Sequence, residues 1–597
     1  MPARIFDILD HTLENHPRDD AFAFKRNGNW KKFSTEKYVE LANLVSLGLL
    51  GMGFRKGDRI ATVSINNRPE WNFVDMGMSQ IGVVHVPMYP TISRLDYQYI
   101  LKEAEIKLVF ISDKMLYRKI HPIISEVDKI KDIYTFDRIK GINNWYEIVK
   151  LGREKKNKLQ EKLKKIKQSI KPEDFTTLLY TSGTTGFPKG VMLSHRNIIS
   201  NVLTSSKLQP LGSKHKVLSF LPLCHIFERT SNYQFQYSGT GIYYAENFRT
   251  IPENLCETKA DGFTTVPRLL EKVYLAILNQ RSNLKGIRKK ILDWSLQVAG
   301  DYPLNHKLKA SYKLKRKIAG ILVFRKLRKA MGGKVRFIGC GGASLRTSVE
   351  KVLWAAGIPV FQGYGLTETS PLITLNHYPL EKSCIGTVGT VINGVQVKIA
   401  GDGEILCKGP NVMLGYYKNP ELTKEVLDEN GWFYTGDIGK FHNGNFLKIA
   451  GRKKELFKTS YGKYVAPQII ENRLIESEFI EQLMVIGEGE KFASAIISPN
   501  FTMLSKWLET IHKIKIPDRK KLIKFPQVIA RFEEEITKCN QSLGMSEQIK
   551  QFVLVSEKWS VRSSELSPTL KLRRHFILEK YKKLIKNIYN PVKKNRD

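Results

Sequence analysis

The stretch that decides the fold is Leu178-Leu-Tyr-Thr-Ser-Gly-Thr-Thr-Gly-Phe-Pro-Lys-Gly-Val191, in which an apolar run leads into a loop, a lysine and a second apolar run. The loop offers the hydroxyl side chains of Thr181, Ser182, Thr184 and Thr185. Glycines let backbone N–H groups approach phosphate oxygens, and Lys189 supplies a compact cation. We therefore predict a triphosphate-binding loop. It is not a Walker A loop, because the spacing from Gly183 to Lys189 does not fit that motif.

Short apolar runs surround this loop and alternate with helical stretches up to about residue 270. The runs at 59–65, 82–87 and 107–112 are typical of buried strands, and the lengths between them suit crossover helices. This alternation predicts an α/β protein with parallel-rich sheets.

The pattern changes twice further along the chain. Near residue 391 apolar and polar residues alternate strictly and a Gly-Asp-Gly turn follows, which predicts an antiparallel, barrel-like subdomain near 385–450. Beyond Gly451, short strands mix with amphipathic helices. We predict a large N-terminal domain over 1–452 and a small, mobile α+β domain over 453–597.

Composition bounds the class of protein. The 597 residues, 42% of them hydrophobic, exclude a single small binding module and a disordered chain. The six cysteines are scattered, which suggests neither a disulfide framework nor a zinc site. The N-terminus lacks the features of a signal peptide, and no apolar run is long enough to cross a membrane. We expect a cytoplasmic protein.

The chain is strongly basic, with 96 Lys and Arg against 58 Asp and Glu, and two helical stretches concentrate the charge. We interpret the lysine-rich residues 153–171 as a solvated surface helix. Residues 285–336 carry far more cations than acids and have interleaved aromatic side chains. Contact with an anionic membrane surface and a solvated helical face remain equal alternatives for this stretch, and nucleic acid is the weakest.

Two later segments carry polar chemistry. In Gly363-Tyr-Gly-Leu-Thr-Glu-Thr-Ser-Pro371, Tyr364 suits base stacking, Thr367 suits a phosphate and Glu368 suits Mg²⁺. Further on, Asp437 is a carboxylate suited to two ribose hydroxyls, and Arg452 is a second ribose contact.

Six motifs in order now identify a resemblance: TSGTTGFPKG, GCGGASL, GYGLTETSP, YTGDIG, GRKKELFKTSYGKYVAP and SPTLKLRR. The chain resembles the adenylate-forming superfamily of acyl-CoA ligases, luciferases and adenylation domains over nearly its whole length. It is most similar to the long-chain fatty acyl-CoA synthetases, on the residues at 67–71, 221–229, 266–272 and 566–571.

The resemblance implies a nucleotide-binding set. The β- and γ-phosphates would be cradled by Thr181, Ser182, Gly183, Thr184, Thr185, Gly186 and Lys189. The adenine slot would be lined by Gly342, Ala343 and Tyr364, with Gly365 in the same set, and the ribose would be held by Asp437 and Arg452.

The resemblance also implies the catalytic groups. Thr367 would touch the α-phosphate, Glu368 would bind Mg²⁺ and Lys571 would be the adenylation lysine. Lys458 would serve the thioester-forming arrangement, Lys454 would be the hinge and His225 would stand at the mouth of the acyl pocket. The chain departs from many relatives at Gly451, Lys454 and Leu570, where aspartate, aspartate and glycine are usual.

The expected function is ATP-dependent activation of long-chain fatty acids to acyl-CoA through an acyl-adenylate, with Mg²⁺ as cofactor and CoA as co-substrate. AMP and pyrophosphate would be released. The alternatives are a fatty acyl-AMP ligase, a ligase for another carboxylic acid, and a catalytically inactive, membrane-associated scaffold that binds adenylate. We expect peripheral contact with an anionic membrane and no nucleic-acid partner.

Overall fold

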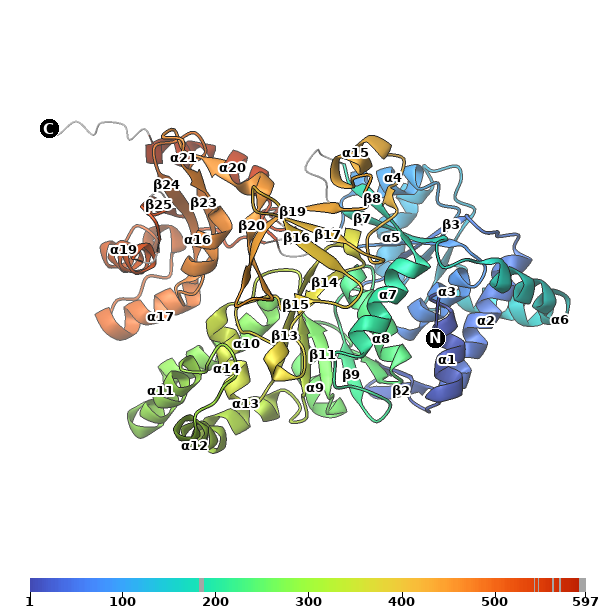
Figure 1. Ribbon diagram of the computed structural model, residues 1–597, viewed down its shortest axis with the longest axis horizontal. Coiled ribbons are helices and arrows are strands. Elements are labelled where there is room, and N and C mark those ends of the chain that lie inside the picture. The colour runs from blue at the N-terminus through green and yellow to red at the C-terminus, as the bar shows by residue number, and fades with distance from the viewer. Residues whose placement is uncertain (182–186, 542, 546, 561–562, 568–570, 590–597) are drawn as a thin grey trace.

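The computed structural model describes the chain except residues 182–186, 542, 546, 561–562, 568–570 and 590–597, and the side chains of 279, 280, 282 and 283. A large body contains two mixed sheets and a smaller antiparallel sheet, and a small domain lies to one side of it (Figure 1). The structure is thus the predicted α/β fold with a small C-terminal α+β domain.

The first sheet of the body is parallel through its centre. Its strands, in spatial order, are β15 (Thr390–Val391), β14 (Leu372–Leu375), β13 (Val360–Gly365), β12 (Phe337–Cys340), β11 (Gly262–Thr265), β9 (Lys216–Ser219), β10 (Gly241–Tyr244), β1 (Phe22–Arg26) and β2 (Asn29–Phe33). The pairs from β13 to β1 are parallel, whereas β14, β15 and β2 join antiparallel.

The second sheet contains the two strands that flank the predicted phosphate loop. Its strands are β18 (Gly415–Tyr416), β8 (Lys189–Ser194), β7 (Phe175–Thr181), β4 (Val84–Met88), β3 (Arg59–Val63), β5 (Leu108–Ile111) and β6 (Asp132–Thr135). The pairs among β3 to β7 are parallel, as predicted, and the predicted strands at 59–65 and 82–87 are observed at 59–63 and 84–88. The second begins later because Gly82 has a φ of +70°, which fits a turn.

The antiparallel sheet and the small domain complete the set of strands. The former is ordered β16 (Gln396–Ile399), β17 (Glu404–Lys408), β19 (Phe433–His442) and β20 (Phe446–Arg452), and it contains the predicted hairpin. The small domain has the hairpin β21 (Phe457–Lys458) and β22 (Tyr464–Val465), and a sheet of β23 (Ile480–Ile486), β24 (Ala493–Pro499) and β25 (Ile549–Leu554).

Helices cover these sheets. Those of the body are α1 (Asp7–Asn15), α2 (Thr35–Gly51), α3 (Pro69–Ser79), α4 (Arg94–Glu103), α5 (Lys114–Ile124), α6 (Trp145–Ser169), α7 (His195–Ser206), α8 (Ile226–Tyr237), α9 (Ile251–Thr258), α10 (Pro267–Asn283), α11 (Gly286–Gly300), α12 (Ala310–Ala319), α13 (Arg325–Ala330), α14 (Thr347–Ala355) and α15 (Pro420–Val426). Those of the small domain are α16 (Pro467–Leu474), α17 (Phe501–His512), α18 (Arg519–Leu522), α19 (Pro526–Asn540), α20 (Arg574–Lys580) and α21 (Lys582–Tyr589).

The lysine-rich helix predicted over 153–171 is the second half of α6. Its charged residues are exposed except Lys167, which is half-buried, whereas Leu163 is buried and Leu159 packs against the core, so the prediction of a surface helix is confirmed. The first half of α6 contacts α2 closely through Gly48 and Gly152: a Cβ atom on Gly152 would lie 1.9 Å from the Leu44 carbonyl oxygen.

Hydrophobic clusters fill both parts of the molecule. The clusters of the body draw on residues between Ile5 and Phe433, and those of the small domain draw on residues between Phe457 and Tyr581. Over the described residues, no helix combines the length and the apolar content that crossing a bilayer requires.

Candidate active site

A lysine, a glutamate and a tyrosine meet at the edge of the second sheet. Lys189 begins β8, Tyr416 lies on its antiparallel neighbour β18, and Glu368 lies in the 3₁₀ turn Thr367–Thr369 after β13. The Lys189 Nζ is 3.1 Å from Glu368 Oε1, and the Tyr416 hydroxyl donates to the same oxygen at 2.9 Å. Lys189 also contacts the Tyr416 hydroxyl, and its ammonium lies 4.1 Å from the ring centroid. The lysine predicted for phosphates and the glutamate predicted for Mg²⁺ are therefore in contact.

The predicted phosphate loop begins and ends on a strand pair. Thr181 of β7 pairs with Lys189 of β8. Ser182, Gly183, Thr184, Thr185 and Gly186 lie outside the described residues. The Thr181 Oγ1 is buried and has no hydrogen-bond partner among the described residues. Because a buried hydroxyl without a partner costs free energy, this atom suits a ligand oxygen that would complete it.

The predicted ribose-binding pair is assembled by the antiparallel sheet. Asp437 of β19 pairs directly with Arg452 of β20, and Arg452 Nε is 2.9 Å from Asp437 Oδ1. The Tyr364 hydroxyl donates to Asp437 Oδ2 at 2.7 Å. Burial raises the pKa of the Asp437 carboxyl, and the Arg452 guanidinium counteracts that increase. This carboxylate is thus held by two side chains of the predicted nucleotide site.

Glycine is required at two positions of the predicted adenine site. Gly342, on the loop after β12, has a φ of +86° and is exposed together with Ala343. A Cβ atom on Gly365 would lie 1.6 Å from the Pro371 carbonyl oxygen, so no side chain fits there. The positive φ of Gly342 and the lack of space beside Gly365 therefore explain why glycine occupies these two positions.

Lys571, in the small domain, interacts electrostatically with residues of this cluster. Burial among surrounding protein atoms lowers the pKa of its ammonium group, and nearby Arg452 lowers it further. Asp437 and Glu368 act in the opposite direction. Lys571 also lowers the pKa of His225. These interactions indicate that Lys571 shares one electrostatic environment with the predicted ribose, metal and acyl-pocket residues.

His225 stands at the start of α8, where its Nδ1 accepts a hydrogen bond from the Phe227 N–H at 3.1 Å and caps the helix. Burial, with a contribution from Lys571, lowers its pKa to about 4, so the imidazole is neutral at pH 7. The capping nitrogen is an acceptor only in a neutral ring, which agrees with that pKa.

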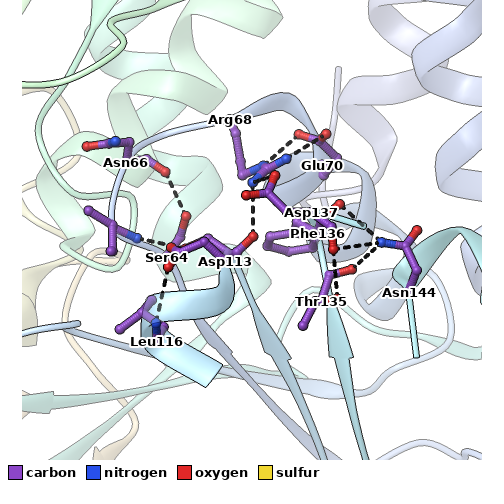
Figure 2. A network of polar contacts seen from close by, with 12 residues as sticks. Ser64, Asn66, Arg68, Glu70, Asp113, Leu116, Thr135, Phe136, Asp137 and Asn144 are labelled. Atoms are coloured by element: carbon purple, nitrogen blue, oxygen red, sulfur yellow. Dashed lines mark hydrogen bonds and ion pairs between the residues drawn. The ribbon is translucent and has the colours of Figure 1, made fainter. Parts of the chain in front are cut away.

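The segments 67–71 and 221–229, separate in the sequence, lie together. The Asn67 side chain donates to the Leu221 carbonyl at 2.7 Å and accepts from the Leu223 N–H at 3.2 Å. Next to it, Arg68 pairs with Glu70 at 2.9 Å and with Asp137 at 3.0 Å (Figure 2). The two hydrogen bonds of Asn67 thus hold the loop that leads to His225.

A buried ion pair that the sequence patterns did not indicate anchors α8 itself. Arg229 is 2.5 Å from Asp75 of α3, and Asp75 also contacts His85 of β4 at 2.6 Å. Breaking a buried pair on one side leaves an uncompensated charge. The pair therefore holds α8, and with it His225, between the two large sheets.

Two predicted residues make no polar contact with this cluster among the described residues. Lys458, on β21, is exposed, and its ammonium is 5.5 Å from the Tyr464 ring centroid. Lys454 is exposed in the 3₁₀ turn Lys453–Glu455 that follows β20. Across the described residues, no hydrogen bond or ion pair joins either lysine to Glu368, Asp437 or Lys571.

The metal chemistry of the site rests on a single carboxylate. In the described part of the chain, no group of three or more His, Cys, Asp or Glu side chains is placed to hold a metal. Glu368 is nevertheless a suitable ligand, because Mg²⁺ is commonly bound by one or two carboxylates together with substrate phosphates and water. Tyr416, which contacts Glu368, is the site residue that sequence reasoning missed, and no local motif around Gly415-Tyr-Tyr417 indicated it.

Comparison with known proteins identifies a family model for each of the two parts of the chain. The family model described as AMP-binding enzyme matches residues 9–417, and the AMP-binding enzyme C-terminal domain matches residues 455–593. The long-chain-fatty-acid–CoA ligase FadD15 of Mycobacterium tuberculosis is 29% identical over 96% of this chain and 96% of its own length. Long chain acyl-CoA synthetase 5 of Arabidopsis thaliana is 30% identical over 99% of this chain and 92% of its own length.

Solved structures share the fold at lower identity. The ATP-bound MatB of Rhodopseudomonas palustris superimposes with a TM-score of 0.70 at 21% identity, covering 98% of this chain and all of that one. The anthranilate CoA ligase AuaEII in complex with anthranoyl-AMP gives a TM-score of 0.70 at 16% identity, covering 97% of this chain and 98% of that one.

Proposed function

This chain belongs to the AMP-binding enzyme family, and from that premise we propose that it uses ATP to activate long-chain fatty acids and joins them to coenzyme A. The structural observation that supports this most directly is the pair of contacts Lys189–Glu368 and Arg452–Asp437, and the pKa of Lys571 from the small domain responds to the charges of Arg452, Asp437 and Glu368. A lysine from one domain beside a carboxylate and an arginine of the other suits the transfer of an anionic group between two bound substrates.

In the first half-reaction, a carboxylate oxygen of the fatty acid attacks the α-phosphorus of ATP. The bond to the pyrophosphate oxygen breaks, and acyl-adenylate and pyrophosphate form. The protein contributes little covalent chemistry to such a displacement and acts by positioning and charge neutralisation. Lys571 and Thr367 supply these effects at the reacting phosphate.

The nucleotide is held along the cluster already described. Lys189 and Thr181 bind the β- and γ-phosphates, Tyr364, Gly342 and Ala343 line the adenine, and Asp437 and Arg452 hold the ribose. Glu368 is the protein ligand for Mg²⁺, which when bound would neutralise phosphate charge. When ATP binds, the Lys189 ammonium leaves Glu368 and contacts the phosphates instead.

In the second half-reaction, the thiol sulfur of coenzyme A attacks the acyl carbonyl carbon, and AMP leaves. Lys571 would obstruct that approach, so the small domain turns about Lys454 and presents Lys458 instead. His225 lies at the mouth of the acyl pocket. The domains that move against one another are residues 1–452 and 453–597.

The test is exchange of labelled pyrophosphate into ATP across a series of fatty acids of increasing length, with and without coenzyme A. Exchange that is greatest with long chains, followed by acyl-CoA formation when coenzyme A is added, is the expected result. Exchange without any acyl-CoA product would indicate a fatty acyl-AMP ligase. If no carboxylic acid supports exchange, only the inactive scaffold remains.

A second part of the proposal is contact with an anionic membrane through the basic helices. On α12 and the π-helix that follows it (Gly320–Phe324), four aliphatic side chains in adjoining turns are exposed: Leu314 by 62%, Ile318 by 42%, Ile321 by 64% and Leu322 by 47%. The exposed cations Lys313, Lys315, Lys317, Arg325 and Lys326 surround them. An apolar stripe rimmed by cations is typical of a helix lying in a membrane interface.

The same helix is fixed to the body on its other side. Arg316 donates to the Ala355 carbonyl at 2.8 Å, and the Tyr312 hydroxyl donates to the Val298 carbonyl at 2.7 Å. Residues that serve the body therefore point inward and leave the stripe unpartnered among the described residues. This separation favours the membrane contact over a merely solvated face, since solvation needs no exposed aliphatic side chains.

Vesicle sedimentation tests the membrane contact. Vesicles of phosphatidylglycerol and phosphatidylcholine should retain the protein, and the double variant Ile318→Ser, Ile321→Ser should lose most of that retention. Lys156→Glu with Lys158→Glu, on exposed positions of α6, is the matched control and should bind as the unmodified protein does. Equal retention of all three proteins would refute the assignment.

A further inference from the structure

The small domain touches the body at a second place, away from Lys571, through a short acidic segment. Glu476 and Glu478 lie between the end of α16 and the start of β23, and Glu481 is the second residue of β23. They face Arg268 and Arg281 of α10 and Arg346 at the start of α14. Acids of one domain thus oppose arginines of the other.

The contact of Glu481 is an ion pair in a half-buried position. The Arg268 guanidinium lies 2.7 Å from Glu481 Oε1, and the two side chains are only 20% and 13% exposed. The same guanidinium also contacts the Glu481 backbone carbonyl at 3.5 Å. Reduced solvent exposure limits screening of this pair by salt.

The contact of Glu476 completes a helix of the other domain. The N-cap residue of α14 is Arg346, which makes no side-chain capping bond. Instead, Glu476 Oε1 accepts a hydrogen bond from the Thr347 N–H at 3.1 Å, and the Ser348 hydroxyl donates to the other carboxylate oxygen. A carboxylate is favoured at a helix N-terminus because the first N–H groups lack partners and the helix dipole is positive there. The small domain therefore supplies the cap that α14 lacks.

A chain of contacts inside the small domain connects these acids to Lys571. Arg574, three residues after Lys571, is 2.6 Å from Glu471 of α16 and 3.0 Å from Glu455 beside the predicted hinge. Glu471 in turn accepts from the Val485 N–H of β23 at 2.8 Å. The acidic segment joins α16 to β23, so its position and that of Lys571 are set by the same packed elements.

We propose that Glu476 and Glu481, docked on the N-terminus of α14 and on Arg268, are positioning residues that hold the small domain where Lys571 reaches the nucleotide site. This inference rests on the proposed function for its catalytic consequence. In that function the contacts form for adenylate formation and break before the thioester step. They act through Lys571 and touch no reacting atom.

The two half-reactions, measured separately, test this assignment. Glu476→Ala with Glu481→Ala should slow pyrophosphate exchange about fivefold to twentyfold, since each lost contact is expected to cost a few-fold. Thioester formation from supplied acyl-adenylate should be unchanged or faster. Glu509→Ala, an exposed glutamate on α17, is the matched control and should leave both half-reactions unchanged. Equal losses in both half-reactions, or unaffected exchange, would overturn the proposal.

A double-mutant cycle separates the ion pair from general damage to the fold. Arg268→Ala and Glu481→Ala should each slow exchange, and the double variant should be no slower than the slower single variant. Fully multiplicative losses would show that the two residues act independently, which contradicts the proposal.

Small-angle X-ray scattering gives a readout that does not depend on any substrate. The Glu476→Ala, Glu481→Ala variant should have a larger radius of gyration than the unmodified protein, because its small domain is released. If the unmodified protein exchanges no pyrophosphate while the variant still expands, the proposed function fails and the docking contact stands. If exchange occurs and the variant neither slows nor expands, the docking contact fails alone.

Discussion

Lys571 combines an exposed side chain with a lowered pKa, and the reason lies in its neighbours. The protein atoms around it disfavour the charged ammonium, and Arg452 adds like-charge repulsion. Asp437 and Glu368 restore part of the cationic character. An amine in such a setting loses its proton at a lower pH than an ordinary lysine. If Lys571 neutralises charge at the α-phosphate, loss of its proton should slow the reaction.

Replacement of Lys571 by alanine should reduce pyrophosphate exchange about 10²- to 10³-fold, since it removes a charged donor aimed at the reacting phosphate. Thioester formation from supplied acyl-adenylate should be largely retained, because Lys571 has no part in that step. Rates of the two half-reactions in the purified variant measure this. Equal loss in both would contradict the assigned role.

The dependence of the pyrophosphate exchange rate on pH should reflect the lowered pKa of Lys571. Activity needs the protonated ammonium, so it should fall on the alkaline side, beginning below the ordinary lysine pKa of 10.5. Lys571→Arg, which stays protonated, should move that decline to higher pH even if its rate is lower. An identical alkaline limb in both proteins would exclude Lys571 as its source.

Two packing features of the body involve glycines on α2 and α6 and a buried acid on α14. The closest approach of α2 and α6 occurs at Gly48 and Gly152, where backbones meet without side chains between them. On α14, Glu350 is buried and accepts hydrogen bonds from Gln362 at 2.8 Å and from the Gly386 N–H at 3.0 Å. Both features concern packing, and each can be tested through stability.

Gly152→Ala should destabilise the fold by about 1–3 kcal/mol, because the new Cβ atom would lie 1.9 Å from a backbone oxygen that cannot move independently. Gly300→Ala at the end of α11 is the matched control, since nothing lies within 4 Å of the atom it adds. Urea unfolding of both variants measures the difference. A Gly152→Ala protein as stable as the control would show that α2 and α6 adjust freely.

Glu350→Gln should make the stability of the protein less sensitive to pH. Burial raises the pKa of Glu350 to about 8 from an ordinary value of 4.5, so the folded state retains a proton that the unfolded state releases in that window. Stability from this group is therefore lost as pH rises between those values. Glutamine has no proton to lose, so the Tm of the variant should fall less between pH 5 and pH 8. Parallel Tm curves for the two proteins would refute the assignment.

The molecule as a whole is a body and a small domain, and Lys453 to Glu455 lie between the last strand of the antiparallel sheet and the first strand of the small domain. Lys453 anchors the body side of this junction through Asp402 at 2.6 Å and Glu404 at 2.7 Å. Beyond it, Arg574 binds Glu455 on the side of the small domain. Lys454, between these anchors, makes no ion pair among the described residues, as a pivot requires.

Lys454→Pro should impede the turn between the two arrangements, because proline fixes φ near −65°. In the described part of the chain, the backbone hydrogen bonds of this junction are donated by the Leu456 N–H to the Arg452 and Lys453 carbonyls. Exchange of pyrophosphate should therefore be largely kept, whereas complete turnover to acyl-CoA should fall at least about tenfold. Full turnover at the unmodified rate would move the pivot elsewhere.

Local patterns in the sequence were sufficient for the strands, the hairpin at 396–408 and the surface helix within α6, because alternation and helical spacing reflect which side of an element is buried. The predicted nucleotide residues Lys189, Glu368, Asp437 and Arg452 came from motifs, and the fold brings them together in two contacting pairs. Whether each performs its predicted role stays a prediction.

Other contacts had no sequence signal, because they join residues far apart in the chain. Tyr416 lies 227 residues from Lys189, and Asp75 lies 154 residues from Arg229. No sequence motif distinguishes Glu476, because its hydrogen bond is made with the start of α14 in a different domain. Amino-acid order was enough to specify the elements and their chemical groups, since periodicity and side-chain type are local properties. Which groups meet depended on the folded chain, since a hydrogen bond or ion pair is governed by distance in space.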